Sequence, residues 1–260
     1  MAQFWDSPYT HRMQIDLSDR SVLVTGASRG IGVAIARKLA EAGARVAVHY
    51  GSSVDEAETL AGEIGGVALQ ADLARIGEPE RLWAEAQARL GAISALVNNA
   101  GIALGSPLDG EAWTENWDLT QAVNLRAPAA LIRAALPHFI AQGGGHIVNI
   151  ASRAAFRGDT PDYLAYAASK GGLVALTRSI ARGFGKQGIV AFTVAPGFTR
   201  TEMAQDFIDQ YGEAYASSDI ALTRMTEPAD IAPTVVFLAS GLMDHATGAT
   251  IDINAGSYVH

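Results

Sequence analysis

The sequence contains no cysteine, which excludes disulfide bonds, thiolate metal sites, cysteine nucleophiles and iron–sulfur clusters. Basic side chains are scarce, because 19 Lys and Arg residues face 27 Asp and Glu residues, for a net charge of -8. This balance argues against nonspecific binding to nucleic acid or to an anionic membrane surface, since both need basic patches. We therefore expect no nucleic-acid partner and no membrane partner.

Long hydrophobic runs are also missing. No stretch approaches the roughly 18 consecutive apolar residues of a membrane span. Residues 1–17 lack the basic region and apolar core of a signal peptide, so we expect an N-terminal extension on a cytoplasmic protein. With 49% hydrophobic and 18% charged residues, the remainder of the chain can build a sizeable core.

Short apolar runs rich in branched residues alternate with longer, alanine-rich segments of helical period. The runs predict strands at 21–25, 46–49, 67–70, 93–98, 146–151, 189–194 and 249–253. The intervening segments predict helices at 31–42, 54–64, 79–90, 114–140, 162–184 and 228–239. Strands this continuously apolar are typical of a parallel sheet that helices cover on both faces.

This alternation favours an α/β fold. We expect residues 18–260 to form a single doubly wound, Rossmann-type domain, with a seven-stranded, mainly parallel sheet flanked by helices. No linker offers a boundary for a second domain. Residues 196–225 are the only long segment that breaks the alternation, and we expect them to form a lid or pocket wall for the substrate.

A glycine-rich turn, TGASRGIG at 25–32, follows the first predicted strand and opens the first predicted helix. Glycines let the backbone turn tightly and approach a pyrophosphate, to which the helix N-terminus offers unpaired N–H groups. The spacing is G-x-x-x-G-x-G rather than the general G-x-G-x-x-G. A simple helix cap is the alternative interpretation of this turn.

The residues after the second predicted strand bear on which dinucleotide would bind. In NAD-binding proteins of this architecture, an acid about 20 residues after the glycine turn accepts a hydrogen bond from a ribose hydroxyl. Here the first acid is Asp55, whereas Arg29, His49, Tyr50 and Ser52 could hold a 2′-phosphate. We therefore favour NADP(H) over NAD(H), the alternative being that Arg29 only faces solvent.

Tyr166 and Lys170 are one helical turn apart, so their side chains share a face of the predicted helix. A phenol with a pKa of about 10 is a weak base at pH 7, and lowering that pKa by three costs about 4 kcal/mol. An ammonium at about 5 Å supplies roughly 3 kcal/mol of this. The pair is thus suited to proton transfer to or from a substrate oxygen.

These motifs, together with Asn98-Asn99-Ala100-Gly101, Asn124, Ser152 and Pro196-Gly197, occur in the order and spacing of the short-chain dehydrogenases/reductases. The chain resembles the single-domain branch of that family from about residue 17 to its C-terminus. The run at 25–32, Val-Ala-Pro-Gly-Phe at 194–198 and the segment 224–232 look closest to reductases of 3-oxoacyl thioesters.

The resemblance implies a catalytic set of Asn124, Ser152, Tyr166 and Lys170. Tyr166 would be the general acid/base, and Lys170 would lower its pKa and hold the nicotinamide ribose. Ser152 would hydrogen-bond the substrate oxygen. The main chain of Asn124 would hold a water of the proton relay.

The expected cofactor-binding residues are Gly26, Ser28, Arg29, Gly30, Ile31, Gly32, His49, Tyr50, Ser52, Asp72, Leu73, Asn98, Ala100, Gly101, Tyr166, Lys170, Pro196, Gly197, Thr199 and Thr201. The resemblance implies that Asp72 contacts the adenine and that the segment from Pro196 contacts the nicotinamide. Taken singly, Asp72, Asn98 and Ser152 could instead be caps or turn residues. No metal site is expected.

The expected substrate pocket is largely apolar, with Arg157 and Asp159 as candidate polar contacts and walls from Ala154, Phe156, Tyr163, Phe198, Met203, Phe207 and Tyr211. Packing between short helices is the alternative for the late aromatic residues. The sequence departs from the family in two places. Ser152 and Tyr166 are 14 residues apart, one more than in many members, and Phe192 stands where many have Asn.

Pro128 lies four residues after Asn124 in a predicted helix and has no N–H to donate to the Asn124 carbonyl. We therefore expect a kink at this point and a free carbonyl that keeps the water site of the relay open.

Three functions stay open. The first is an NADP(H)-dependent oxidoreductase of a ketone or 3-oxoacyl compound, and the second an NAD(P)-dependent sugar, polyol or secondary-alcohol dehydrogenase. The third is a non-catalytic dinucleotide-binding protein, against which the intact catalytic set argues. The resemblance also implies a homotetramer, and the small residues of the predicted helix 162–184 would allow close helix approach.

Overall fold

The structure is a computed structural model that describes residues 15–212 and 218–259. Most of the expected N-terminal extension and the side chains of Met203, Phe207 and Tyr211 lie outside the described part. Leu17 is 1% exposed and its N–H donates to the Ala42 carbonyl at 2.6 Å. The packed core therefore begins before residue 18.

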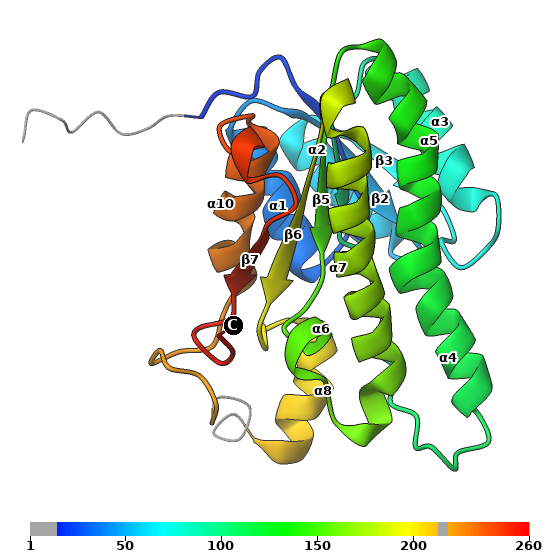
Figure 1. Cartoon of the computed structure of the whole chain (residues 1–260), viewed down its shortest axis with the longest axis vertical. Coiled ribbons are helices and arrows are strands. Elements are labelled where there is room, and N and C mark those ends of the chain that lie inside the picture. Colours follow the sequence, from blue (N-terminus) through cyan, green and yellow to red (C-terminus); the bar gives the residue numbers. More distant parts are fainter. Residues whose placement is uncertain (1–14, 213–217, 260) are drawn as a thin grey trace, which may run out of the picture.

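Seven parallel strands form one sheet in the order β3-β2-β1-β4-β5-β6-β7 (Figure 1). This confirms the predicted fold, and each predicted strand is present with ends shifted by two residues or fewer. The strands are β1 (Ser21–Val24), β2 (Arg45–Tyr50), β3 (Val67–Gln70), β4 (Ala95–Asn98), β5 (Gly145–Ile150), β6 (Ile189–Pro196) and β7 (Thr250–Ile253). The strands that follow β1 in the chain are added on one side of it as far as β3, and from β4 onwards they are added on the other side. Ligands of open α/β sheets bind at such a switch point, which here lies between β1 and β4.

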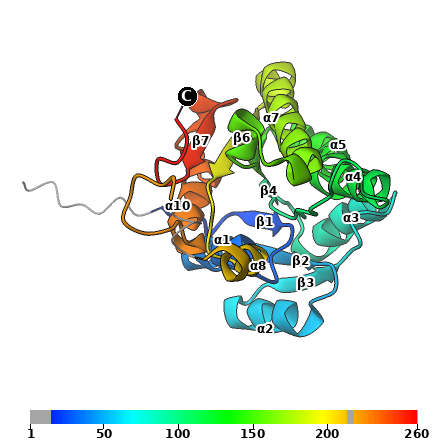
Figure 2. The same cartoon turned by 90° about the horizontal axis from the view of Figure 1, so that it is seen from below.

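Helices cover both faces of the sheet (Figures 1 and 2). They are α1 (Gly30–Glu41), α2 (Val54–Ile64), α3 (Glu78–Leu90), α4 (Trp113–Gln121), α5 (Ala127–Ala141), α6 (Ala154–Arg157), α7 (Leu164–Phe184), α8 (Glu202–Tyr211) and α10 (Pro228–Ala239). Three short 3-10 turns span Pro161–Tyr163, Gly185–Gln187 and Asp244–Ala246. Of the helices, α6 and α8 were not predicted.

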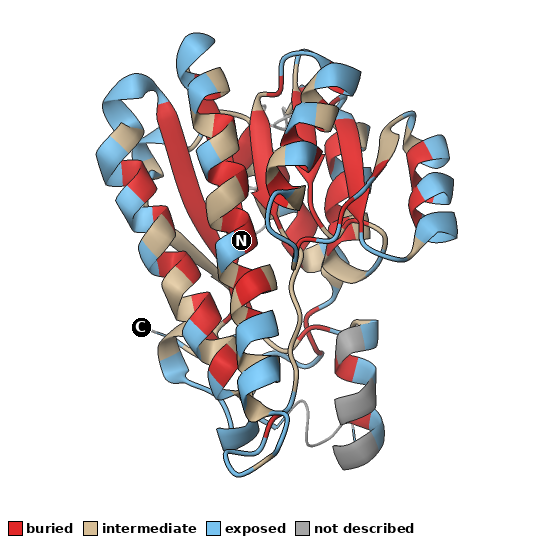
Figure 3. Ribbon diagram, turned by 90° about the vertical axis from the view of Figure 1, so that its right-hand side faces the viewer, coloured by how far each residue is buried: buried red, intermediate tan, exposed pale blue. Residues whose placement is uncertain are grey.

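Alternate residues of each strand point to opposite faces, which creates two apolar layers. Val22 and Val24 of β1 pack with α1, α2 and α10, whereas Leu23 packs with α3, α5 and α7. Figure 3 shows the strands buried between helices whose outer faces are exposed. Burying one Leu or Val side chain stabilises the fold by roughly 1.5–3 kcal/mol. The two apolar layers therefore hold the strands, and the residues at their ends, in fixed positions.

The predicted helix 114–140 is divided into α4 and α5 by a π-helical turn at Ala122–Arg126. The Ala127 N–H donates to the Ala122 carbonyl, five residues back, instead of four. Pro128 explains the wider turn, because it has no N–H and its ring would collide with a carbonyl four residues earlier. The interruption falls at Asn124, where the sequence predicted a distortion.

Candidate active site

The expected catalytic residues meet at the C-terminal ends of β4 and β5. Ser152 follows β5, Tyr166 and Lys170 lie on α7, and Asn124 lies in the π-helical turn. In Figure 1 the lower ends of these strands face α6 and the start of α7. Residues that are up to 46 positions apart in the chain thus come together at one edge of the sheet.

The Lys170 ammonium lies 5.7 Å from the centre of the Tyr166 ring. It donates a 2.8 Å hydrogen bond to the Ile150 carbonyl, and burial lowers its pKa to about 8. Burial also raises the pKa of the Tyr166 phenol, against a hydrogen bond with Ser152 that lowers it, while the Asp159 carboxylate raises it further. This direction is opposite to the lowering expected from Lys170, because loss of hydration outweighs the other influences.

Asn124 is fully buried and uses its whole side chain. Its Oδ1 accepts from the Ile102 N–H, and its Nδ2 donates to the Ile102 carbonyl and to Ser169 Oγ at 2.9–3.0 Å. Ser169 in turn donates to the Tyr166 carbonyl at 2.7 Å. Sequence reasoning missed Ser169, although a polar residue beside Lys170 on the buried face of the helix was a usable signal.

The glycine turn has the backbone that its sequence predicts. Gly26 and Gly30 have φ of +61° and +57°, and a Cβ on Gly32 would lie 2.2 Å from the Gly26 carbonyl oxygen. No side chain caps the N-terminus of α1, and its first turn carries no acid. Its backbone N–H groups are therefore available to a pyrophosphate, and the site fits a dinucleotide.

Two residues hold this turn that the expected set omits. Thr25 Oγ1 accepts from the N–H groups of Asn99 and Ala100 at 2.9 and 3.0 Å. Asn99 Nδ2 donates to the carbonyls of Thr25 and Gly26, both at 2.9 Å. The turn after β4 thus supports the glycine turn through hydrogen bonds.

His49 does not have the role expected from the sequence. It is 3% exposed, Nδ1 accepts from the Gly26 N–H at 3.0 Å, and Nε2 lies 3.1 Å from the Ala71 carbonyl. Burial lowers its pKa to about 4. A neutral ring with both nitrogens engaged cannot hold a phosphate, so the 2′-phosphate assignment is corrected to a structural contact within the turn.

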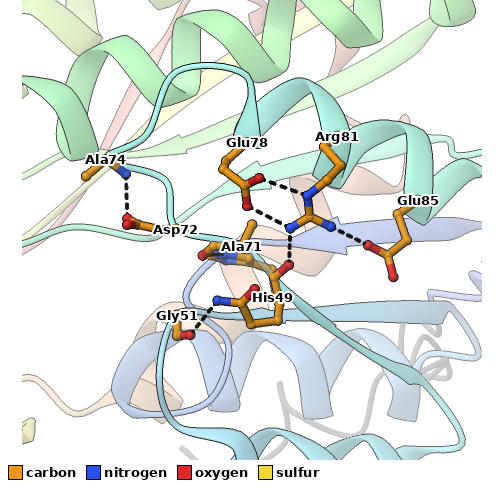
Figure 4. Close-up of polar contacts among 9 residues, drawn as sticks. His49, Gly51, Ala71, Asp72, Ala74, Glu78, Arg81 and Glu85 are labelled. Carbon is orange, nitrogen blue, oxygen red and sulfur yellow. Dashed lines mark hydrogen bonds and ion pairs between the residues drawn. The ribbon is translucent and has the colours of Figure 1, made fainter.

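The loop after β3 lies next to His49 (Figure 4). Asp72 is exposed there, and its Oδ1 accepts from the Ala74 N–H at 3.0 Å, while the Leu73 side chain is buried in the core. The Asn98 side chain is also buried, and its Nδ2 donates to Asn149 Oδ1 at 2.8 Å. The side chains of Leu73 and Asn98 thus face the core, away from the expected cofactor contacts.

The remaining residues of the expected phosphate pocket are spread over two elements. Tyr50 is 9% exposed at the end of β2, and Ser52 is exposed in the following loop. Arg29 is exposed at the start of α1, and its guanidinium lies 3.5 Å from the Glu202 carboxylate. Because both side chains of this pair are exposed, the ion pair is weak.

The segment after β6 reaches the glycine turn from the other side. The Gly197 N–H donates to the Ile253 carbonyl, and Thr199 Oγ1 donates to the Gly197 carbonyl, both at 3.0 Å. A Cβ on Gly30 would lie 3.4 Å from Thr201 Cγ2. Residues 197–201 therefore lie close enough to the turn to share a dinucleotide with it.

Among the expected substrate residues, Ala154 lies beside Ser152 and its N–H donates to Ser152 Oγ at 3.1 Å. Ala154 is buried, the Phe156 ring stacks on Tyr258 with centres 6.2 Å apart, and the Tyr163 hydroxyl approaches Gly105. Phe198 packs against a small apolar cluster of the late segment.

An ion-pair cluster joins the Ser152 loop to the late segment. Arg153 and Arg157 both donate to one oxygen of Asp219, at 2.8 and 2.6 Å. These hydrogen bonds outweigh burial and lower the pKa of Asp219. Arg157, one of the two polar residues expected at the pocket, is thus held in an ion-pair cluster beside the Ser152 loop.

Among residues 15–212 and 218–259, no helix is long and apolar enough to cross a membrane. The same residues contain no group of three or more His, Asp or Glu side chains arranged to hold a metal ion.

The chain matches known proteins along most of its length. The family described as enoyl-(acyl carrier protein) reductase matches residues 26–258. The 3-oxoacyl-[acyl-carrier-protein] reductase FabG of Staphylococcus aureus (strain Mu50 / ATCC 700699) is 38% identical over 245 residues, which is 92% of this chain and 98% of that protein.

Two solved structures share the fold. A putative NAD(P)-dependent gluconate 5-dehydrogenase from Beutenbergia cavernae with bound NADP is 34% identical with a TM-score of 0.86, covering 94% of this chain and 98% of that one. A blue fluorescent protein from a metagenomic library in complex with NADPH is 37% identical, also with a TM-score of 0.86, covering 94% and 100%. The glycine turn, the Ser–Tyr–Lys arrangement and these similarities agree: the chain belongs to the short-chain dehydrogenase/reductase family and is an oxidoreductase that acts between CH–OH and C=O groups.

Proposed function

We propose that the protein is an NADP(H)-dependent reductase of a ketone or 3-oxoacyl compound, with Tyr166 as the group that moves the proton. One observation carries the proposal, namely that Lys170 lies 5.7 Å from the centre of the Tyr166 ring beside Ser152. The similarity to 3-oxoacyl-[acyl-carrier-protein] reductase over most of the chain supports this substrate class.

The cofactor, when bound, supplies the hydride that reduces the carbonyl carbon. The backbone N–H groups at the start of α1 would hold its pyrophosphate, Asp72 its adenine, and Thr199 and Thr201 its nicotinamide end. Lys170 would hold the ribose hydroxyls next to the nicotinamide.

Residues of this chain supply the proton that the substrate oxygen receives. Ser152 orients the substrate oxygen, and the Tyr166 phenol, which burial keeps protonated at neutral pH, donates its proton to that oxygen. The Lys170 ammonium stabilises the phenolate that remains. The Asn124 main chain would hold a relay water, which returns a proton towards the Lys170 side.

The preference for NADP(H) rests on the end of β2, where residues 50–53 carry no acid and Arg29 lies across the turn. An acid there would repel a 2′-phosphate. Both solved neighbours contain NADP or NADPH. Thermal unfolding with NADPH and with NADH at equal concentrations tests this point, and greater stabilisation by NADH would contradict it.

Replacing Tyr166 by Phe tests the chemical role. We expect turnover to fall by at least about 1,000-fold, because the acid is lost, while NADPH binding stays within about twofold. Retained turnover in the Phe variant would overturn the assignment.

A polyol or sugar-acid dehydrogenase is the second candidate. The ion-pair cluster of Arg153, Arg157 and Asp219 gives the pocket a polar wall, and one neighbour is a putative gluconate 5-dehydrogenase. Parallel assays with 3-oxoacyl thioesters and with polyols or sugar acids separate the candidates by kcat/KM.

We further propose a cytoplasmic homotetramer in which residues 18–260 act as one catalytic domain and residues 196–225 wall the substrate site. Ala168 and Ala175 are exposed on α7 and Gly171 lies on the same side, so a second copy could approach this helix closely. Light scattering tests the assembly, and a monomer mass would contradict it.

A further inference from the structure

His49 connects three segments at the end of β2. Its ring Nδ1 accepts from the Gly26 N–H at 3.0 Å, and its backbone carbonyl accepts from the Ala27 N–H at 2.8 Å. On the other side, its Nε2 contacts the Ala71 carbonyl at 3.1 Å. One buried residue thus holds two consecutive N–H groups of the glycine turn and the first residue of the loop after β3.

These contacts fix the state of the ring. Because the Gly26 N–H needs an acceptor, Nδ1 carries no proton and Nε2–H donates to the Ala71 carbonyl. A protonated ring would present an N–H to the Gly26 N–H. The charged groups on surrounding elements include Arg29 on the turn, Asp72 after β3, Asp55 and Glu56 on α2, and Arg81 on α3 with its partners Glu78 and Glu85. Of these, Arg81 further disfavours protonation.

The two segments that His49 joins are those assigned to different parts of the cofactor. The start of α1, which follows the glycine turn directly, would hold the pyrophosphate, and Asp72, which follows Ala71, would hold the adenine. We propose that His49 is a positioning residue that sets the spacing between these two subsites, and thereby the affinity for a ligand that spans both. This inference rests on the proposed NADP(H) binding.

A neutral histidine suits this task because it offers an acceptor and a donor on opposite sides of one rigid plane. Phenylalanine keeps most of the volume but neither hydrogen bond. Glutamine offers a donor and an acceptor at the end of a flexible chain, so it can restore the contacts only in part.

The test compares His49→Phe and His49→Gln with the unchanged protein, using two probes. NADPH spans both subsites, whereas adenosine 2′-monophosphate occupies the adenine side alone. We expect His49→Phe to weaken NADPH binding about 30-fold and adenosine 2′-monophosphate binding less than about threefold. His49→Gln should recover part of the loss, and kcat at saturating NADPH should stay within about threefold.

His146→Phe is the matched control. His146 is 6% exposed and hydrogen-bonded to Asp244 at 2.9 Å, but it lies at the other end of the sheet. This variant should lose stability and keep its NADPH affinity. Titration calorimetry measures the binding of both probes, and denaturant unfolding measures the stability of each variant.

The outcomes are distinguishable. If the unchanged protein does not bind NADPH, the proposed function fails. If it binds and His49→Phe binds equally well, or loses both probes to the same extent, only the inference on His49 is overturned. If His49→Phe does not fold, His49→Gln decides by the same comparison of the two probes.

Discussion

The two ends of the sheet carry similar residues and serve different purposes. At the C-terminal end, His49 holds the glycine turn, and the N-terminus of α1 is left without a side-chain cap. At the N-terminal end, His146 pairs with Asp244 beside a cavity of about 730 Å³, lined mainly by polar residues and glycines.

This cavity lies away from the catalytic residues. Helices α5, α7 and α10 end near the cavity, so the helix dipoles there point negative charge towards it, whereas the start of α1 presents positive charge. Volume alone does not identify an active site. The catalytic end of this sheet is marked instead by the uncapped backbone N–H groups of α1 and by the buried side chains of Tyr166 and Lys170.

The largest expected effect comes from replacing a glycine by alanine, which adds one methyl group, at either end of the sheet. Alanine at Gly32 would meet the Gly26 carbonyl at 2.2 Å, and alanine at Gly188 would meet the Gly143 carbonyl at 2.4 Å. We expect each substitution to cost about 3 kcal/mol of unfolding free energy. Only Gly32→Ala should also weaken NADPH binding, by at least about 100-fold in titrations. An equal loss in Gly188→Ala would erase the distinction between the ends.

The next effect is a pH dependence of stability. The pKa of His49 falls from 6.5 in the unfolded chain to about 4 in the folded protein, chiefly through burial. Between these two pH values His49 is protonated in the unfolded chain but not in the folded protein. Its contribution to the free energy of unfolding is therefore fully present above pH 6.5 and is lost as the pH falls towards 4. His49 contributes about 3 kcal/mol to this loss.

Urea unfolding between pH 7 and 4 measures it. The unchanged protein should lose more stability over this interval than His49→Phe, which has no group to protonate. Parallel curves for the two proteins would show that His49 is not the group responsible.

A smaller effect concerns the phosphate side of the turn. Arg29→Gln removes the exposed cation at the start of α1, so NADPH affinity should fall about tenfold while NADH affinity stays unchanged. The ratio of the two dissociation constants is the readout. If both fall together, Arg29 holds the pyrophosphate region rather than the 2′-phosphate.

The smallest effect is expected at the N-terminal end. Asp244→Asn weakens a half-exposed contact with His146, for which about 0.5 kcal/mol is the expected cost. Neither NADPH binding nor turnover should change. A loss of turnover would mean that a change beside the cavity affects the catalytic residues at the other end of the sheet.

Most strands and the catalytic pair could be predicted because their signals are local. Val22 to Val24 can only be a buried strand, and Tyr166 and Lys170 share a face in any helix. The division of α4 from α5 was half predicted, since Pro128 requires a distortion but not a π-helical turn. His49 was misassigned, because a histidine at the end of a strand suits a phosphate as well as a backbone N–H.

The sequence by itself determined the α/β alternation, the glycine turn and the spacing of the catalytic residues, since each depends on neighbours along the chain. Only the tertiary structure decided which polar side chains face a ligand and which are buried in contacts. His49, Asn98 and Ser169 turn inwards because strands and helices distant in sequence supply their partners. The burial that follows also reverses the expected shift in the pKa of Tyr166, since hydration is lost only when the chain packs.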